Sequence, residues 1–361
     1  MRITITADIH VGVPTKGDDI IWALKKIRQY NAEQGIINWL ILGDLMHDRE
    51  FICVRDLCML TAFLEETHAK YGQRLYAFPG NHDMYLKNSW DINSLKPLSK
   101  HIRGLSNVSK IEFDGRRFWV LPFIHYESEY MRVLGSIEKR YKPGDVLLTH
   151  VGVKNALLNT CFLLKSWSVV DFTQCPFDKI FTGHFHSHQQ VGDNVWYPGS
   201  PIPFKFDEGD VDHGFIVYDT DTHTHEFVSI WYGEKDSSAP PQYLTLDKAS
   251  LDSIPAAEIA GNIIRVALDR GYTHNERLEI KEKLEQLGAR DVRWLQSASD
   301  EDKEAIKLAK KAASSASELF ERYVAADKDG TKDLNHKLLA AMNKEVVSEG
   351  DRRYDYTGDP E

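Results

Sequence analysis

The chain has 361 residues, 42% of them apolar and 27% charged, which is an ordinary composition for a folded protein with room for more than one domain. Its formal net charge of -10 argues against a generic basic nucleic-acid-binding protein, although bound divalent cations can supply positive charge locally. No apolar run reaches the roughly 18 residues of a membrane span, and no signal-peptide pattern opens the chain, so we expect a cytoplasmic protein without membrane segments.

The first two hundred residues alternate strand and helix patterns. Residues 2–8 show the period-two alternation of a strand, and residues 18–35 carry apolar side chains at helical spacing and end at a glycine. A second helix is predicted over 53–72. Further strands are predicted, in chain order, at 37–44, 74–83, 145–152, 179–186 and 194–201, with hairpins at 111–123 and 213–232. This order predicts a layered α/β domain over residues 1–235.

The pattern changes after residue 235. The segment 236–249 is rich in Ser, Pro and charged residues and is expected to be a linker. Residues 250–298 then show strand, helix and strand patterns, which predict a small α+β capping domain. Residues 300–347 are expected to form helices with apolar stripes, and the polar residues 348–361 a disordered tail.

Polar side chains follow five of the predicted strands in the first domain. They are Asp8 and His10; Asp44, His47 and Asp48; Asn81, His82 and Asp83; His150; and His184, His186 and His188. Because ligands of open α/β sheets bind outside the carboxyl ends of the strands, these side chains could converge on one crevice. Asp, His and Asn without Cys form an oxygen and nitrogen donor set, which suits Mn, Fe, Zn or Mg and not a thiolate site.

The spacing within two of these motifs also suits metal binding. In Asp8–His10 and in His184–His186, the side chains at i and i+2 of an extended segment project to the same side, so each pair can reach one cluster. A carboxylate shared by two donor sets would hold two cations roughly 3.5–4 Å apart, which is the spacing of two-metal phosphoesterases.

The motifs D-x-H, GD, GNHD, a strand-end His and GHxH occur in this order over residues 1–200. This set resembles the calcineurin-like metallophosphoesterase superfamily. The resemblance implies an α/β fold in which a layered β-sandwich is flanked by helices. It also implies a centre that binds two divalent metal ions.

Two longer stretches narrow the resemblance. The segment ILGDLMHD before a helix, and GHFHSHQ leading into YPGSPIPFKFDEGDVDHG, are similar to the SbcD-type branch of DNA-repair nucleases, which has phage members. That resemblance implies an Mn²⁺-dependent 3′–5′ exonuclease and endonuclease that acts on DNA in repair and recombination. It also implies a homodimer paired through the helix after residue 53, and an SbcC-type SMC-like ATPase partner bound through the helices at 300–347.

The resemblance also assigns roles to individual residues. One metal ion would take Asp8, His10, Asp44 and His186, and the other would take Asp44, Asn81, His150 and His184, so that Asp44 is shared. His82 would stabilise the transition state or protonate the leaving oxygen, with Asp83 orienting its ring. His47 would contact the phosphate or position the DNA.

Two other functions fit parts of the sequence. A phosphomonoesterase or cyclic-nucleotide phosphodiesterase of the same superfamily would suit the acidic net charge, but such enzymes seldom carry an extra β-α-β unit and further helices. A non-catalytic scaffold with this fold would be expected to have lost ligands, whereas every motif is complete here. The apolar stripes at 300–347 could bind a partner or pack internally.

Overall fold

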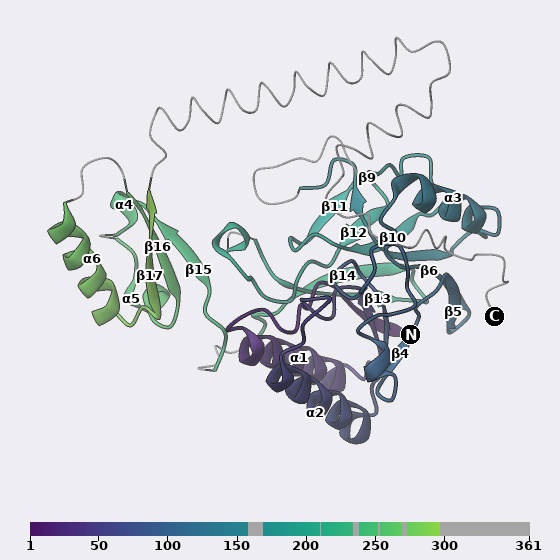
Figure 1. The fold of residues 1–361 in the computed structure, drawn as a ribbon, viewed down its shortest axis with the longest axis horizontal. Coiled ribbons are helices and arrows are strands. Elements are labelled where there is room, and N and C mark those ends of the chain that lie inside the picture. Colours follow the sequence, from purple (N-terminus) through teal and green to yellow (C-terminus); the bar gives the residue numbers. More distant parts are fainter. Residues whose placement is uncertain (158–168, 210, 234–237, 252, 269–272, 297–361) are drawn as a thin grey trace, which may run out of the picture.

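The computed structural model describes residues 1–157, 169–209, 211–233, 238–251, 253–268 and 273–296 (Figure 1). The helices predicted at 300–347 and the tail predicted at 348–361 lie outside these described residues. Among the described helices, none combines the length and the apolar character that a membrane crossing needs.

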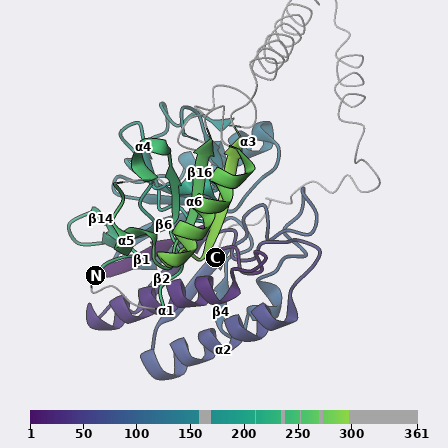
Figure 2. The same ribbon diagram turned by 90° about the vertical axis from the view of Figure 1, so that its left-hand side faces the viewer.

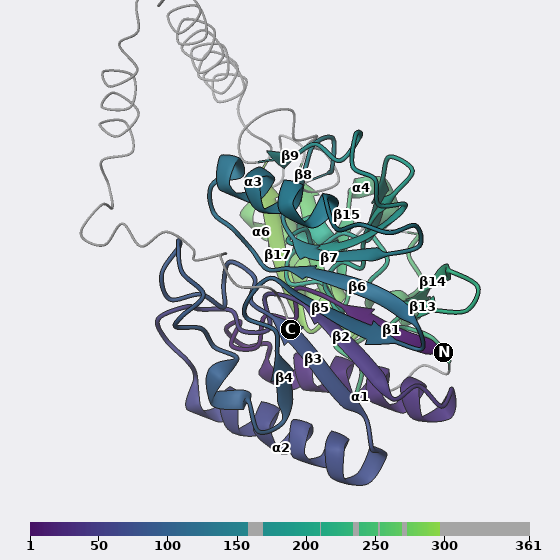
Figure 3. The ribbon, with the colours of Figure 1, turned by 90° about the vertical axis from the view of Figure 1, so that its right-hand side faces the viewer.

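Two six-stranded sheets pack face to face (Figure 3). The first has the order β14-β13-β1-β2-β3-β4, with β1 (Arg2–Thr6), β2 (Asn38–Leu42), β3 (Arg74–Phe78), β4 (Ile102–Gly104), β13 (Gly214–Asp219) and β14 (Thr224–Ser229). The second has the order β11-β12-β10-β7-β6-β5, with β5 (Ser109–Phe113), β6 (Arg116–Leu121), β7 (Val146–His150), β10 (Lys179–Gly183), β11 (Gln189–Val191) and β12 (Val195–Tyr197). β8 (Gly152–Val153) and β9 (Val169–Val170) form a short separate pair.

Helices cover the outer faces of both sheets. α1 (Gly17–Glu33) and α2 (Val54–Tyr71) pack on the first sheet, and α3 (Glu127–Glu138) packs on the second (Figure 3). The predicted α/β fold, a layered β-sandwich flanked by helices, is therefore confirmed.

The alternation in β1 shows how one strand serves two layers. Ile3 and Ile5 belong to the apolar core between the sheets, together with Phe118 of β6. Thr6 lies on the other face, where its hydroxyl accepts a hydrogen bond of 2.8 Å from the indole N–H of Trp39. Thr4 lies on the same face, and its hydroxyl donates a hydrogen bond to Oδ1 of Asn31 in α1. The two buried hydroxyls on the helix side of the strand are thus both paired, as burial requires.

Parallel pairing brings the strand ends of each sheet to one edge. β1, β2 and β3 run parallel to one another, and so do β6, β7 and β10 in the second sheet. The loops that leave the carboxyl ends of these strands therefore meet, which is where ligands bind in such sheets.

A small third sheet follows the sandwich (Figure 2). It contains the parallel strands β15 (Tyr243–Leu246), β16 (Ile263–Leu268) and β17 (Asp291–Gln296), with α4 (Lys248–Leu251), α5 (Ala256–Ile259) and α6 (His274–Gln286). Leu246, Ile264 and Leu284 belong to its own apolar core. β15 lies inside the segment 236–249 that was expected to be a linker. The strand was not predicted, because four residues are too few for an alternating pattern to stand out among prolines and charged residues.

Asp145, just before β7, is a buried carboxylate with a full set of partners. It accepts hydrogen bonds from the Arg117 guanidinium at 2.7 and 2.6 Å, and from the indole of Trp119 at 2.9 Å. Asp145→Ala leaves the Arg117 charge without its partner, so we expect the free energy of unfolding to fall by about 3–5 kcal/mol in urea denaturation.

The matched control for this prediction is Glu226→Ala. Glu226 is the exposed partner of Arg2, at 2.6 Å, and exposed pairs contribute about 0–1 kcal/mol. Equal losses of unfolding free energy in the two variants would contradict a special role for the buried pair.

Candidate metal centre

The ligands predicted from the sequence lie where the parallel strands end. They are Asp8 and His10 after β1, Asp44 after β2, Asn81 after β3, His150 at the end of β7, and His184 and His186 after β10. Ligand atoms within 4.8 Å of one another occur in the groups Asp8, His10 and His186; Asp8, Asp44 and His150; and His10, His47 and His82. The structure thus gathers residues that are far apart in the sequence at one edge of the sandwich.

The backbone is unusual at several of these positions. Asp8, His10, Asp44 and His184 have φ angles of 52°, 54°, 50° and 105°, in the left-handed region that residues other than glycine seldom adopt. Strained φ angles persist only where the surrounding structure holds them, and they cluster at ligand-binding sites. Here they mark the sharp turns that the chain makes as it leaves β1, β2 and β10.

Two glycines let the loops approach one another. A Cβ atom on Gly80 would lie 2.2 Å from Oδ1 of Asp44, and one on Gly43 would lie 2.5 Å from Nδ1 of His150. Neither distance leaves room for a side chain, so the glycines of the GD and GNHD motifs are required for the close approach of these loops.

Asp44, Asn81, His150 and His184 form one donor group. Nε2 of His150 lies 3.3 Å from Oδ2 of Asp44 and 3.1 Å from Oδ1 of Asn81. Nδ1 of His184 lies 2.9 Å from the same Asn81 oxygen. His150 donates from Nδ1 to the carbonyl oxygen of Leu42 at 2.7 Å, which fixes the ring with Nε2 toward the other donors.

Asp8, His10, Asp44 and His186 form the second donor group. The Nε2 atoms of His10 and His186 lie 3.0 Å apart, and Nε2 of His10 lies 3.8 Å from Oδ2 of Asp44. The backbone N–H of His184 donates to both oxygens of Asp8 at 3.0 Å, which holds that carboxylate in place. Asp44 contacts both groups.

The electrostatics of the centre suit the binding of cations. Burial raises the pKa of Asp8 to about 7. Burial alone would lower the pKa of His150, but the charge of Asp44 and the hydrogen bond with it raise that pKa to about 9. Burial lowers the pKa of His184 to about 3, so this imidazole is neutral at pH 7 and can act as a ligand. A divalent cation would displace the protons that Asp8 and His150 retain.

His47 and His82 lie beside the two donor groups. Their rings are stacked with centroids 5.6 Å apart, and both make edge contacts with His10, at 5.4 and 4.8 Å. His82 donates from Nδ1 to the carbonyl oxygen of His47 at 2.6 Å. This bond fixes the His82 ring and leaves Nε2 as the nitrogen that can meet a ligand.

The prediction that Asp83 orients the His82 ring is wrong, because the His47 carbonyl holds that ring instead. Asp83 is 1% exposed and accepts hydrogen bonds of 2.6–3.2 Å from the backbone N–H groups of Leu45, Met46 and Gly80 and from the Ser94 hydroxyl. Its carboxylate therefore ties the loop after β2 to the loop after β3, and it positions Asp44 and Asn81 relative to one another.

Glu208 and Phe204 are residues of the centre to which the sequence analysis gave no role. Glu208 is 3% exposed, and one carboxylate oxygen accepts a hydrogen bond of 2.9 Å from Nδ1 of His186. The Phe204 ring makes edge contacts with His10 and His186 at 5.7 and 5.5 Å. Metal-binding histidines commonly donate their second N–H to a carboxylate, as His186 does to Glu208. The acidic residues of the FDEG segment, which follows the PGS motif, were the signal in the sequence for such a carboxylate.

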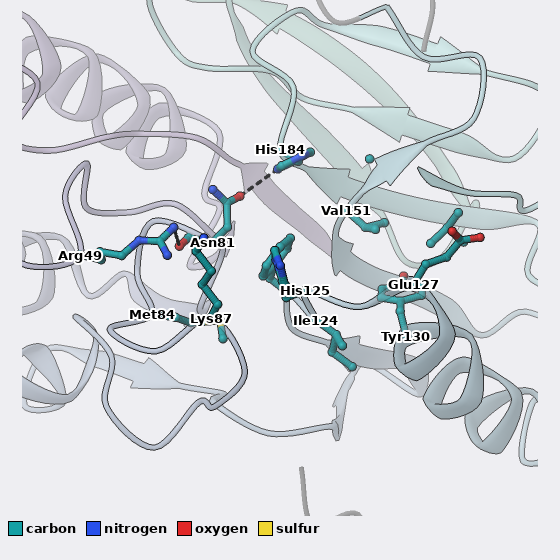
Figure 4. Close-up of a pocket in the computed structure, with 13 residues that line it drawn as sticks. Arg49, Asn81, Met84, Lys87, Ile124, His125, Glu127, Tyr130, Val151 and His184 are labelled. Atoms are coloured by element: carbon teal, nitrogen blue, oxygen red, sulfur yellow. Dashed lines mark hydrogen bonds between the residues drawn. The ribbon is translucent and has the colours of Figure 1, made fainter. Parts of the chain in front are cut away.

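A pocket of about 320 Å³ adjoins Asn81 and His184 (Figure 4). Its lining includes the cationic side chains of Arg49 and Lys87 and the rings of Phe123 and His125. The Phe123 ring is stacked against that of His184, with centroids 6.0 Å apart, and Arg49 donates to the backbone carbonyl of Asn81 at 2.9 Å. Positive charge and aromatic surface thus lie directly beside one donor group.

The layered sandwich and its clustered aspartates and histidines define a metal-dependent phosphoesterase. Residues 1–212 match the family model of the calcineurin-like phosphoesterases, and the chain belongs to this family. Exonuclease subunit 1 of Enterobacteria phage T4 is 25% identical over 239 residues, which cover 63% of this chain and 67% of that protein. Among solved structures, GAP50, the anchor in the inner membrane complex of Plasmodium, has a TM-score of 0.40 and 11% identity, over 66% of this chain and 90% of that one.

The residues present fit the divalent metal ions that this family implies. The donors are carboxylate, amide and imidazole groups, which are ligands for Mn, Fe, Zn or Mg. Within the described residues, Nδ1 of His10 and Nδ1 of His47 are buried without a hydrogen-bond partner, so the centre is not fully satisfied by protein contacts alone.

Asp44→Ala tests whether one carboxylate serves both donor groups. Because Asp44 lies against histidines of both groups, we expect the variant to lose both metal ions when metal content is measured after dialysis. Asp48→Ala, an exposed carboxylate that caps the turn after His47, is the control and should keep the wild-type metal content. Retention of both ions by Asp44→Ala would contradict the shared-ligand assignment.

Proposed function

We propose that the protein is an Mn²⁺-dependent DNA nuclease that hydrolyses phosphodiester bonds by a two-metal mechanism. The observation that carries the proposal is the position of Asp44, which lies between His10 of one donor group and His150 of the other. His82 stands beside both groups, and within the described part of the chain only its Nδ1 makes a hydrogen bond from the ring. Shared metal ligands with a separate proton-carrying group are what this reaction requires.

Each residue of the centre has a role in this proposal. One ion would be held by Asp8, His10, Asp44 and His186, and the other by Asp44, Asn81, His150 and His184. Bound divalent ions lower the pKa of water and neutralise charge on phosphate oxygens. His82 would stabilise the transition state or donate a proton to the leaving oxygen, held in place by its bond to the His47 carbonyl. The His47 ring would contact the same phosphate group.

The pocket beside Asn81 supports a nucleic-acid substrate. Bases stack on aromatic side chains with about 1–3 kcal/mol each, and Arg and Lys contact phosphates. Phe123 and His125 supply rings, and Arg49 and Lys87 supply charge, within the same cavity. The name of the T4 relative, an exonuclease subunit, also supports hydrolysis of a nucleic acid from an end.

Partner chains are part of the proposal. The T4 relative is one subunit of an exonuclease, which supports a second subunit here, and we propose an SbcC-type SMC-like ATPase bound through residues 300–347. A homodimer is proposed through α2, because Val54 at its start and Phe51 and Ile52 just before it are 74%, 77% and 40% exposed. A homodimeric nuclease bound to such an ATPase would act in DNA repair and recombination.

The substrate class is tested by comparing three substrates with the purified, Mn²⁺-loaded protein. We expect hydrolysis of duplex DNA from its 3′ ends and of a nitrophenyl phosphodiester, with little turnover of a nitrophenyl monoester. The net charge of -10 favours a second candidate, a phosphomonoesterase or a cyclic-nucleotide phosphodiesterase. A preference for the monoester would support the phosphomonoesterase, and turnover of the nitrophenyl diester without turnover of DNA would support the cyclic-nucleotide phosphodiesterase. No turnover of DNA by protein with confirmed metal content would contradict a nuclease.

His82→Ala separates the metal ligands from the proton-carrying group. We expect both ions to remain bound while turnover of DNA falls by about 10²–10⁴-fold, the usual contribution of a general acid. Metal content by mass spectrometry and kcat on the same samples give the two readouts. Loss of an ion from this variant would show that His82 is a ligand.

A further inference from the structure

One short segment contacts both the metal centre and the small C-terminal sheet. It consists of residues 204–208 and includes the 3₁₀ turn η2 (Phe206–Glu208). Phe204 and Glu208, at its two ends, contact His186. Phe206 and Asp207, between them, contact residues of β15 and β16. Neighbouring residues of a single turn thus serve two parts of the molecule.

The contact with the small sheet is compact and specific. Phe206 is 9% exposed and forms a small apolar cluster with Tyr243 of β15 and Ile263 of β16. The rings of Phe206 and Tyr243 meet edge to face with centroids 4.9 Å apart. The guanidinium of Arg265 lies 4.6 Å from the centre of the Phe206 ring, and its Nη1 lies 3.6 Å from Oδ1 of Asp207. We refer to Phe206, Asp207, Tyr243, Ile263 and Arg265 together as the seam.

The backbone at the seam lies directly against the small sheet. A Cβ atom on Gly209 would lie 2.2 Å from the carbonyl oxygen of Tyr243, so β15 rests directly on the chain that follows Glu208. The loop that leaves His10 reaches the same strand, because the Lys16 ammonium lies 4.8 Å from the centre of the Tyr243 ring. Two loops of the metal centre therefore converge on Tyr243.

Glu208 is held by hydrogen bonds to residues inside and outside its own segment. One carboxylate oxygen accepts the hydrogen bond from His186, and the other accepts one of 2.8 Å from the backbone N–H of Phe204. Its carbonyl oxygen lies 3.0 Å from Nε2 of the buried His213, which donates to it. Phe206 lies between Phe204 and Glu208 in the chain and shares the 3₁₀ turn with Glu208, so a displacement of Phe206 would act on Glu208 through the backbone of this turn.

We propose that residues 204–208 couple the position of the small sheet to the orientation of His186. In this proposal Phe206, Asp207 and Arg265 are positioning residues: they hold the turn whose Glu208 bonds to the His186 imidazole, which would bind the same ion as His10. The proposal rests on the proposed metal centre. Coupling is reciprocal, so occupation of that centre should also stabilise the seam.

Metal titration of the full-length chain by calorimetry with Mn²⁺ tests the coupling. Glu208→Ala sets the reference, because loss of the carboxylate behind a ligating histidine costs about 10–100-fold in metal affinity. We expect Phe206→Ala to weaken one of the two ions in the same direction and to leave the other unchanged. Phe206→Leu, which keeps an apolar side chain in the seam, should recover most of the loss.

The control lies on the same small sheet but away from the seam. Lys281→Ala on α6 removes only an exposed pair with Glu285, at 3.6 Å, and should bind both ions as the wild type does. The coupling would be overturned if Phe206→Ala bound both ions with affinities within about twofold of wild type while Glu208→Ala showed a clear loss. Absence of Mn²⁺ binding to the wild type would instead overturn the proposed metal centre.

Hydrogen exchange gives the reciprocal readout and does not depend on activity. Addition of Mn²⁺ to the wild type should slow amide exchange in Tyr243–Leu246, which lies outside the metal centre, and Glu208→Ala should abolish that protection. If the amides of Tyr243–Leu246 exchange at the same rate with and without Mn²⁺ while the ion binds, the two parts are independent and the proposal fails.

Discussion

The burial of Asp44 is the constraint on which the centre depends. This carboxylate is 2% exposed and lies against His10 and His150, and it accepts a hydrogen bond of 2.8 Å from the backbone N–H of His82. An ionised carboxylate is costly to bury unless it is paired. Burial alone would raise the pKa of Asp44, but the charge of His150 and its hydrogen bond lower it, so the carboxylate remains ionised. Each surrounding loop therefore contributes a compensating partner.

The need to surround a buried Asp44 carboxylate with partners explains the residues found at positions 80 and 83. Gly80 has to lack a side chain because Oδ1 of Asp44 occupies the place where its Cβ would be. Asp83 fastens the loop that carries Asp44 to the loop that carries Asn81 through bonds to backbone N–H groups on both. The left-handed φ of Asp44 itself is tolerated because these contacts hold the turn.

The fold class and the metal-binding residue types could be predicted because their signals are local. Each motif directly follows an apolar strand, as in LILGD and LLTH, so the position of every proposed ligand at a strand end is readable within about ten residues. The partner of a side chain is not local. Asp83 bonds to Leu45, 38 positions away, and His186 bonds to Glu208, 22 positions away, and neither pairing follows from spacing. The β15 strand was missed because it contains only four residues.

The contact between the small sheet and the sandwich suits the transmission of a movement from the small sheet to the metal centre. Its core of Leu246, Ile264 and Leu284 is separate from the cores of the sandwich, and the seam around Phe206 is a small cluster of its own. Two units with separate cores joined by a limited contact are expected to move relative to one another. Because the contact falls on the turn that carries Glu208, such movement would act on His186 through its hydrogen bond to that carboxylate. A macromolecule bound to the small sheet could therefore act on the metal centre without touching it.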